Sequence, residues 1–146
     1  MRFMRQQRRL LRLGALGLLA FLALSSLAGA LLAEGALHPH RKALSAEDER
    51  HARDLARAAG AHLADVAITA VDGVTLRAWT LRPQDANGNA VILLHGHTDN
   101  RMGMIGYAQL LLRHHYLVLM PDARAHGASG GALGTYGLLE AEDLRR

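Results

Sequence analysis

The hydrophobic pattern of the chain begins with an apolar run over residues 13–33, in which 21 consecutive residues carry no charge. At about 1.5 Å per residue, a helix of this length crosses a hydrocarbon core of about 30 Å. Five arginines lie on one side of the run only, within residues 1–12, and basic flanking residues stay in the cytoplasm. The pattern therefore predicts a basic cytoplasmic arm (1–12), a single-pass transmembrane anchor (13–33) and an extracytoplasmic domain.

A cleaved signal peptide is the alternative to an anchor. Ala28-Gly29-Ala30 has the small-x-small form of a cleavage site, and residues 13–24 have the length of a signal-peptide apolar region. The apolar run continues through residues 31–33, beyond that site, which favours the anchor. Both interpretations export the rest of the chain, either bound to the membrane or secreted.

Residues 34–63 are predicted to form a juxtamembrane linker and a short helix. Ser45 is followed by the acidic turn Glu47-Asp48-Glu49, which is typical of a helix N-terminus. Small apolar residues then recur at helical spacing as far as Gly60, which suits a C-cap. Because this helix is short and weakly apolar, we expect it to be a spacer that packs on the edge of the domain.

From residue 64 onward the pattern alternates between strand and helix periods. Residues 66–80 alternate around Asp72-Gly73, a hairpin turn signal. Residues 90–94 (AVILL) are continuously apolar, as expected of a strand buried on both faces. Three further segments follow: an amphipathic helix over 104–112, an apolar strand over 116–120 and the start of a helix over 136–146. The order predicts an α/β fold with an N-terminal β-hairpin and then parallel strands joined by a crossover helix.

The charge of the chain changes this picture little. There are 17 basic and 13 acidic side chains, but outside the N-terminal arm 12 basic side chains face 13 acidic ones. No basic stripe interleaved with aromatic residues follows the arm, so nucleic-acid binding is not predicted. The chain contains no Cys, which excludes disulfides and thiolate catalysis.

The candidate chemistry lies in two loops that follow the two predicted parallel strands. These are His95-Gly96-His97 and residues 122–131 (DARAHGASGG). Open α/β sheets bind ligands beyond the carboxyl ends of their strands. Glycine there lets backbone N–H groups approach a ligand, and such groups can hold the oxyanion of an acyl-transfer reaction. Either loop alone also fits a structural turn, and Asp122 and Arg124 fit a brace within the second loop.

Together, VILLHGHTDN, the helix that follows it, and YLVLMPDARAHGASGG resemble the α/β-hydrolase superfamily, in particular its exported or membrane-anchored esterases and serine aminopeptidase-like members. The resemblance covers residues 64–146 and the N-terminal part of such a domain. It implies a partial α/β-hydrolase fold. It also implies a serine hydrolase that attacks the ester or amide carbonyl of a small molecule, with no cofactor and no metal.

The resemblance also implies roles for single residues. The strand-end HG-x motif of the family matches His95-Gly96-His97, so the His97 N–H would be an oxyanion-hole donor and the three residues would contact substrate. The D-x-R-G-x-G-x-S loop of the family matches the second loop, although Ala125 stands where the family often has Gly. The implied loop scaffold consists of Asn100, Arg101, Asp122, Arg124, His126, Gly127 and Ser129.

The nucleophile of the family lies in G-x-S-x-G, on a sharp turn between a strand and a helix. Residues 127–131 (GASGG) match this pattern, but they follow the polar segment PDARAH instead of an apolar strand, and they come too early in the chain order. Ser129 is therefore not expected to be the nucleophile. We expect the nucleophile, acid and base beyond residue 146, so this polypeptide would be the front part of an enzyme and inactive alone.

Two other functions fit parts of the pattern. His95-x-His97-x-Asp99 is similar to the H-x-H-x-D-H zinc motif of metallo-β-lactamase-like hydrolases, but Asn100 occupies the last position. A catalytically inactive, membrane-anchored binding module would also lack a triad. The sequence specifies neither the substrate nor the oligomeric state.

Overall fold

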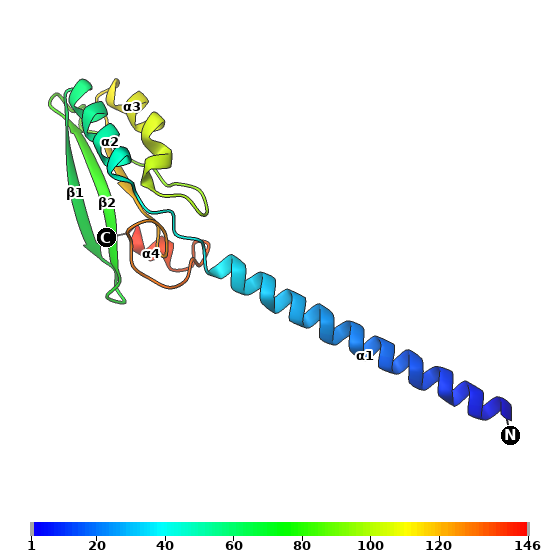
Figure 1. Cartoon of the computed structure of the whole chain (residues 1–146). Coiled ribbons are helices and arrows are strands. Elements are labelled where there is room, and N and C mark those ends of the chain that lie inside the picture. Colours follow the sequence, from blue (N-terminus) through cyan, green and yellow to red (C-terminus); the bar gives the residue numbers. More distant parts are fainter. Residues whose placement is uncertain (1, 146) are drawn as a thin grey trace. The chain divides into compact units, whose positions relative to one another are not determined.

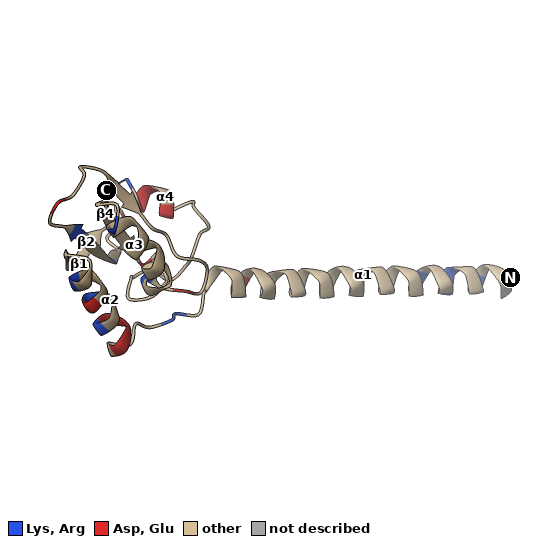
Figure 2. Ribbon diagram, turned by 90° about the horizontal axis from the view of Figure 1, so that it is seen from above, with Lys and Arg blue, Asp and Glu red and all other residues tan. Residues whose placement is uncertain are grey.

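The computed structural model describes residues 2–145, and the chain forms two compact units, Met1–Ala36 and Leu37–Arg146. Helix α1 (Arg2–Leu37) makes up the first unit (Figure 1). Figure 2 shows that the basic residues of α1 are concentrated towards the N-terminus, with a long uncharged stretch after them. From Phe3 to Leu37 the helix is long and apolar enough to cross a membrane, a property that a signal sequence near the N-terminus shares. The predicted span over 13–33 lies inside this helix.

The second unit is a four-stranded mixed sheet with helices packed on it (Figure 1). The strand order is β1-β2-β4-β3; β1 pairs antiparallel with β2, β2 antiparallel with β4, and β4 parallel with β3. In chain order the elements are α2 (Ala46–Ala58), β1 (Ala61–Thr69), β2 (Thr75–Pro83), β3 (Ala90–Ile92), the 3₁₀ helix η1 (Arg101–Met104), α3 (Ile105–Leu112), β4 (Leu117–Pro121) and α4 (Glu140–Asp143).

The predicted hairpin and the predicted parallel crossover are both confirmed. Strands β1 and β2 pair over their whole length around a turn in which Gly73 has φ +84°, a conformation that favours glycine. Strands β3 and β4 are parallel and are joined through η1 and α3. The fold class is therefore α/β, as the alternating pattern predicts.

One face of the sheet carries the hydrophobic core. Helices α2 and α3 pack there against alternate residues of the central strands, and the cluster consists of Ala52, Ala56, Trp79, Leu81, Ala108, Leu112, Val118 and Met120. Helix α2 packs on the domain as expected, but it contributes to the core and not only to the edge, since Ala52 and Ala56 are at most 1% exposed. Their small side chains allow the helix to approach the sheet closely, which low apolarity alone does not reveal. Strand β1 begins at Ala61, so the expected domain start at 64 falls inside it.

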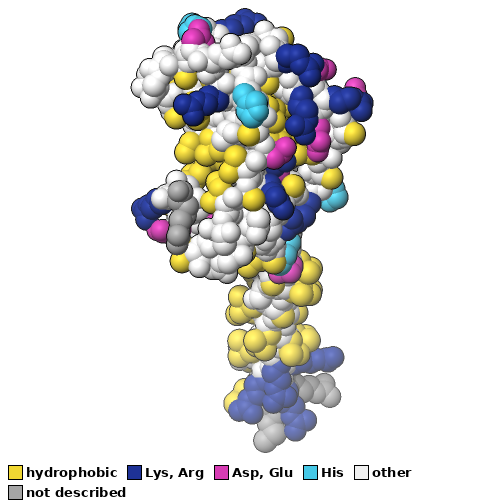
Figure 3. Space-filling view, turned by 90° about the vertical axis from the view of Figure 1, so that its left-hand side faces the viewer, with side chains coloured by type: hydrophobic (Ala, Val, Ile, Leu, Met, Phe, Trp, Pro, Cys, Tyr) yellow, Lys and Arg dark blue, Asp and Glu magenta, His cyan; other side chains and the backbone are white. Residues whose placement is uncertain are grey.

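The expectation that residues 90–94 form a strand buried on both faces is also wrong. Strand β3 is an edge strand of only three residues, and Ile92 and Leu94 are 45% and 50% exposed. Both side chains point to the sheet face opposite α2 and α3. On that face they line an apolar groove of about 450 Å³, together with Ile68, Leu76 and Leu119. Figure 3 shows apolar side chains gathered on the surface of this unit. A continuous apolar run predicts that both faces of the strand are covered, whereas the second face of β3 borders this groove.

The last predicted helix is shorter than expected. Helix α4 begins at Glu140, not at Tyr136, and residue 146 lies outside the described residues. The Glu140 carboxylate accepts hydrogen bonds from the N–H of Thr135 and of Gly137, at 2.7 and 2.8 Å. These bonds fold residues 135–139 into turns, with φ +51° at Tyr136 and +104° at Gly137, so the helix cannot start earlier.

Candidate functional site

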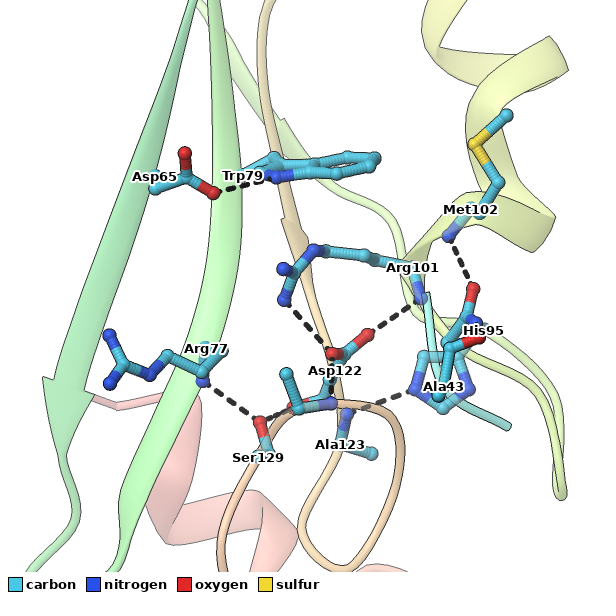
Figure 4. Close-up of polar contacts among 12 residues, drawn as sticks. Ala43, Asp65, Arg77, Trp79, His95, Arg101, Met102, Asp122, Ala123 and Ser129 are labelled. Carbon is cyan, nitrogen blue, oxygen red and sulfur yellow. Dashed lines mark hydrogen bonds and ion pairs between the residues drawn. The ribbon is translucent and has the colours of Figure 1, made fainter. Parts of the chain in front are cut away.

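Two polar loops meet at one edge of the sheet, at the carboxyl ends of the parallel strands β3 and β4. The first contains His95-Gly96-His97 and the second covers residues 122–131. They are in direct contact, because the N–H of Ala123 donates to Nε2 of His95 over 3.0 Å (Figure 4). The other ring nitrogen, Nδ1, lies 2.8 Å from the carbonyl oxygen of Gly96, so a proton on Nδ1 satisfies both contacts. The structure thus brings together the two loops that the sequence predicts to be neighbours.

A buried carboxylate, that of Asp122, joins the second loop to η1. It accepts hydrogen bonds from the N–H of Arg101 (2.7 Å), from Nη1 of Arg101 (2.9 Å) and from the N–H of Ala128 (2.7 Å). The Arg101 guanidinium also lies over the Trp79 ring, 4.7 Å from its centroid (Figure 4). Burial lowers the pKa of Arg101, and the charge of Asp122 opposes that shift. The two side chains form an ion pair with less than a tenth of either exposed to solvent.

Ser129, the serine of the G-x-S-x-G match, is fully buried. Its hydroxyl donates to the carbonyl oxygen of Asp122 over 2.7 Å and accepts from the N–H of Arg77 in β2 over 2.8 Å. A nucleophilic serine needs an accessible hydroxyl beside a base. The Ser129 hydroxyl instead fastens the second loop to strand β2 (Figure 4).

Three residues of the second loop, Ala125, Gly127 and Gly131, have positive φ. Gly127 has φ +47°, and a Cβ there would lie 2.2 Å from Oδ2 of Asp122, so the buried carboxylate requires glycine. Ala125 has φ +61°, where a Cβ is disfavoured. This is the position at which the sequence resemblance expects glycine. Ala125 therefore adopts the backbone conformation that favours glycine, although it carries a Cβ.

Arg124 ties the second loop to two distant acidic residues. It donates from Nη1 to Oδ2 of Asp72 in the hairpin turn (2.6 Å), and from Nε and Nη2 to the Asp143 carboxylate of α4 (3.1 and 2.7 Å). Asp143 and Asp72 together raise the pKa of Arg124. The hydrogen bond from Arg124 lowers the pKa of Asp72 below its ordinary value of 3.8. Arg124 therefore braces the second loop against the hairpin turn and α4, and it does not pair with Asp122 as the sequence suggests.

The Asp72 contact predicts a change in acid stability. Because the pKa of Asp72 is lower in the folded chain, its contribution is present above the unfolded value of 3.8 and is lost as the pH falls through the folded value. We expect the melting temperature of the native chain to fall more than that of Asp72→Asn between about pH 5 and pH 2. Circular dichroism in a mild detergent measures this. Parallel curves for the two proteins would show that the contact does not form.

The first loop is a strained turn that presents a backbone donor. The N–H of Asp99 donates to the carbonyl oxygen of Gly96 over 3.2 Å, and Thr98 between them has φ +62°. A β-branched residue in this region is unusual, and strain of this kind concentrates at functional sites. His97 is exposed, and its N–H donates to no group within residues 2–145. The turn therefore leaves this N–H available to a ligand.

Thr98→Gly is expected to stabilise the fold by about 0.5–1 kcal/mol, because glycine removes the Cβ strain at positive φ and Thr98 is exposed. Urea denaturation of the full chain in mild detergent measures the change. Thr69→Gly is the matched control, since Thr69 is an exposed strand residue that does not have positive φ. It should destabilise the chain, and equal losses in both variants would contradict the strained turn.

The side chains of three histidines surround a small hollow beside this turn. The ring centroid of His126 lies 5.2 Å from that of His95 and 5.5 Å from that of His97, and the His97 ring stacks on Tyr136 at 5.4 Å. The hollow measures about 150 Å³. His126 is buried, and its Nδ1 lies 2.8 Å from the carbonyl oxygen of Arg124. The side chain of His97, a predicted site residue, therefore lines the hollow and is exposed to solvent, whereas that of His126 is buried.

The segment before α2 contacts both loops, although the sequence predicts only a linker there. The Arg41 guanidinium donates to the carbonyl oxygens of Ser129 and Gly131. Lys42 pairs with Asp99 over 2.7 Å and lowers the pKa of that carboxyl. No local pattern indicates these partners, because they lie more than 50 residues further along the chain.

Asn100, which the resemblance places in the loop scaffold, makes contacts that the sequence does not predict. It is fully buried, its Oδ1 accepts from the N–H of Met102 over 2.9 Å, and it caps η1. Its Nδ2 donates to the carbonyl oxygen of Lys42 over 3.0 Å. The side chain thus links the first loop to the linker segment.

The zinc alternative is not favoured by the geometry of its residues. Both ring nitrogens of His95 contact backbone groups, and Asp99 is paired with Lys42. Among residues 2–145 no group of three or more histidine, aspartate or glutamate side chains is arranged to hold a metal ion. The motif His95-x-His97-x-Asp99 therefore serves as a turn in this structure.

Comparison with known proteins places these loops in a wider context. No family model matches the chain. Over 74 residues it is 35% identical to the uncharacterised protein YqkD of Bacillus subtilis (strain 168), a match that covers 51% of this chain and 24% of that protein.

Among solved structures, the esterase Pf2001 of Pyrococcus furiosus is similar with a TM-score of 0.61 and 34% identity, over 75% of this chain and 40% of the esterase. The hypothetical protein PA2218 of Pseudomonas aeruginosa has a TM-score of 0.51 at 22% identity, over 59% of this chain and 29% of that one, which shows a common fold alone. The chain spans less than half the length of each of these proteins.

Proposed function

We propose that this chain, which is related to the α/β-hydrolases and has part of their fold, supplies the oxyanion-hole side of a serine hydrolase acting on an ester or amide carbonyl. The observation that carries the proposal is the N–H of His97, an exposed residue in the loop after the parallel strand β3, which donates to no group within residues 2–145. Similarity to an esterase at 34% identity supports this reaction class and does not favour the zinc hydrolase or an inactive binding module.

The chemistry follows from where charge develops in acyl transfer. A serine hydroxyl attacks the carbonyl carbon, histidine takes the proton, and negative charge gathers on the carbonyl oxygen. A backbone N–H aimed at that oxygen stabilises the transition state more than the substrate. In this proposal the His97 N–H is one such donor, the three residues from His95 to His97 border the substrate, and the Asp122–Arg101 pair holds the loops in position.

Ser129 is not the nucleophile in this proposal, because its hydroxyl is buried and bonded on both sides. We therefore expect this polypeptide alone not to hydrolyse 4-nitrophenyl acetate above the rate of the buffer. Turnover that disappears in Ser129→Ala would overturn this assignment.

The direct test is a chimera in which residues 37–146 replace the equivalent part of the Pf2001 esterase. We expect turnover of 4-nitrophenyl acetate and labelling by a fluorophosphonate, which reports an activated serine. The esterase remainder without residues 37–146 is the control and should show neither. A chimera that melts cooperatively but shows no turnover would contradict the proposal.

We further propose that α1 anchors the protein, with the arginine-rich arm in the cytoplasm and the second unit outside. The length and apolarity of α1 support a span, and cleavage after Ala30 is the alternative. Mass spectrometry of the protein from membranes distinguishes the two. An intact N-terminus is expected, whereas a chain that begins at Leu31 would show a secreted protein.

A further inference from the structure

The first third of α1 carries a stripe of arginines on one face. Arg5, Arg8, Arg9 and Arg12 are spaced i, i+3, i+4 and i+7 along a continuous helix, so their side chains project from the same side. All four are exposed. We call these four residues the arginine stripe. Figure 3 shows basic side chains gathered at this end of the helix, next to its apolar segment.

Nothing in the described chain neutralises the stripe. The first acidic residue of the sequence is Glu34, and none of the four arginines has an ion pair or hydrogen-bonded side-chain partner within residues 2–145. Arginines four residues apart repel one another on a helix, and cations near a helix N-terminus oppose its dipole. The helical arm therefore gains stability from an anionic partner supplied from outside the chain.

The position of the stripe along the helix matches one layer of a bilayer. Counted from Leu13 at about 1.5 Å per residue, Arg12 lies about 1.5 Å, Arg8 and Arg9 about 6–8 Å, and Arg5 about 12 Å beyond the uncharged segment. The polar headgroup layer is about 5–8 Å thick on each side of the hydrocarbon core. When the uncharged segment fills the core, Arg12, Arg9 and Arg8 lie within the headgroup layer, at the level of the lipid phosphates, and Arg5 lies about 4 Å beyond it.

We propose that the arginine stripe is a binding site for the phosphate headgroups of anionic phospholipids. All five basic residues of the arm are arginine. The planar guanidinium donates two parallel hydrogen bonds to one phosphate, a geometry that lysine does not offer. Electrostatic attraction to an anionic leaflet adds to this for each basic side chain near the surface. The inference rests on the proposed membrane span and is independent of the proposed hydrolase reaction.

The test is lipid selectivity of the full chain reconstituted in phosphatidylcholine vesicles. Electron paramagnetic resonance with spin-labelled phosphatidylglycerol or phosphatidylcholine measures which lipid is immobilised beside the helix. We expect the phosphatidylglycerol probe to associate at least about threefold more strongly, and this preference to weaken with added salt. The quadruple variant with Arg5, Arg8, Arg9 and Arg12 replaced by Gln should lose the preference.

A matched control removes the same number of charges elsewhere. Arg50, Arg53, Arg57 and Arg113 are exposed in the second unit, and their replacement by Gln should leave the preference intact. Equal loss in both quadruple variants would reduce the effect to net charge and overturn the site. Immobilised lipid without preference in the native chain would also overturn it. Absence of any immobilised lipid would overturn the span and the stripe together, and would leave the hydrolase proposal standing.

Discussion

Asp122→Ala is expected to lower the free energy of unfolding by about 3–5 kcal/mol. The change leaves the guanidinium of Arg101, which is 5% exposed, without its counter-charge. It also leaves two backbone N–H groups, those of Arg101 and Ala128, without their acceptor. Denaturant titration of the full chain in a mild detergent measures the loss. The fluorescence of Trp79, the one tryptophan, reports it directly, because Arg101 lies over its ring.

Two variants sharpen this experiment. Asp54→Ala removes an exposed carboxylate that pairs with Arg57 on the surface of α2, and it should cost less than about 1 kcal/mol. Asp122→Asn keeps one acceptor oxygen and should lie between the two. If Asp122→Ala cost no more than Asp54→Ala, the buried pair would not be what holds the loops together.

His97→Pro is expected to lower kcat of the esterase chimera by about 10²–10³-fold, the usual effect of removing one oxyanion donor. Proline has no N–H, so the substitution deletes the proposed donor itself. We expect the turn to tolerate proline, because His97 precedes Thr98, whose φ is +62°, in a turn closed by the hydrogen bond from Asp99 to Gly96, and proline is favoured at that position. Steady-state kinetics with 4-nitrophenyl acetate measures the effect.

His97→Ala is the matched control, since it removes the imidazole and keeps the N–H. It should change KM more than kcat, because the imidazole borders the hollow and stacks on Tyr136. A loss of kcat that is the same in both variants would assign the effect to the side chain. Unchanged kcat in the proline variant would remove His97 from the oxyanion hole.

The order and type of the main elements follow from the sequence. Alternation on either side of Asp72-Gly73 predicts the hairpin, and two apolar runs separated by an amphipathic helix predict the parallel strands β3 and β4. These patterns are local, because the hydrophobic period of each strand or helix can be recognised within about ten residues. Because neighbouring parallel strands end at the same edge of a sheet, the sequence also predicts that the two polar loops lie close together. The roles of single residues in the reaction stay predictions.

The tertiary structure decided what depends on residues far apart in the chain. It placed the alanines of α2 in the core and left Ile92 and Leu94 half exposed on an edge strand. It also directed Arg41 to the backbone of the second loop and locked the Ser129 hydroxyl between that loop and β2. The physical reason is that burial and hydrogen bonding are properties of neighbours in space. The sequence determined which segments become strands, helices and polar turns, and the packing of distant segments determined which of their groups are buried, bonded or available to a ligand.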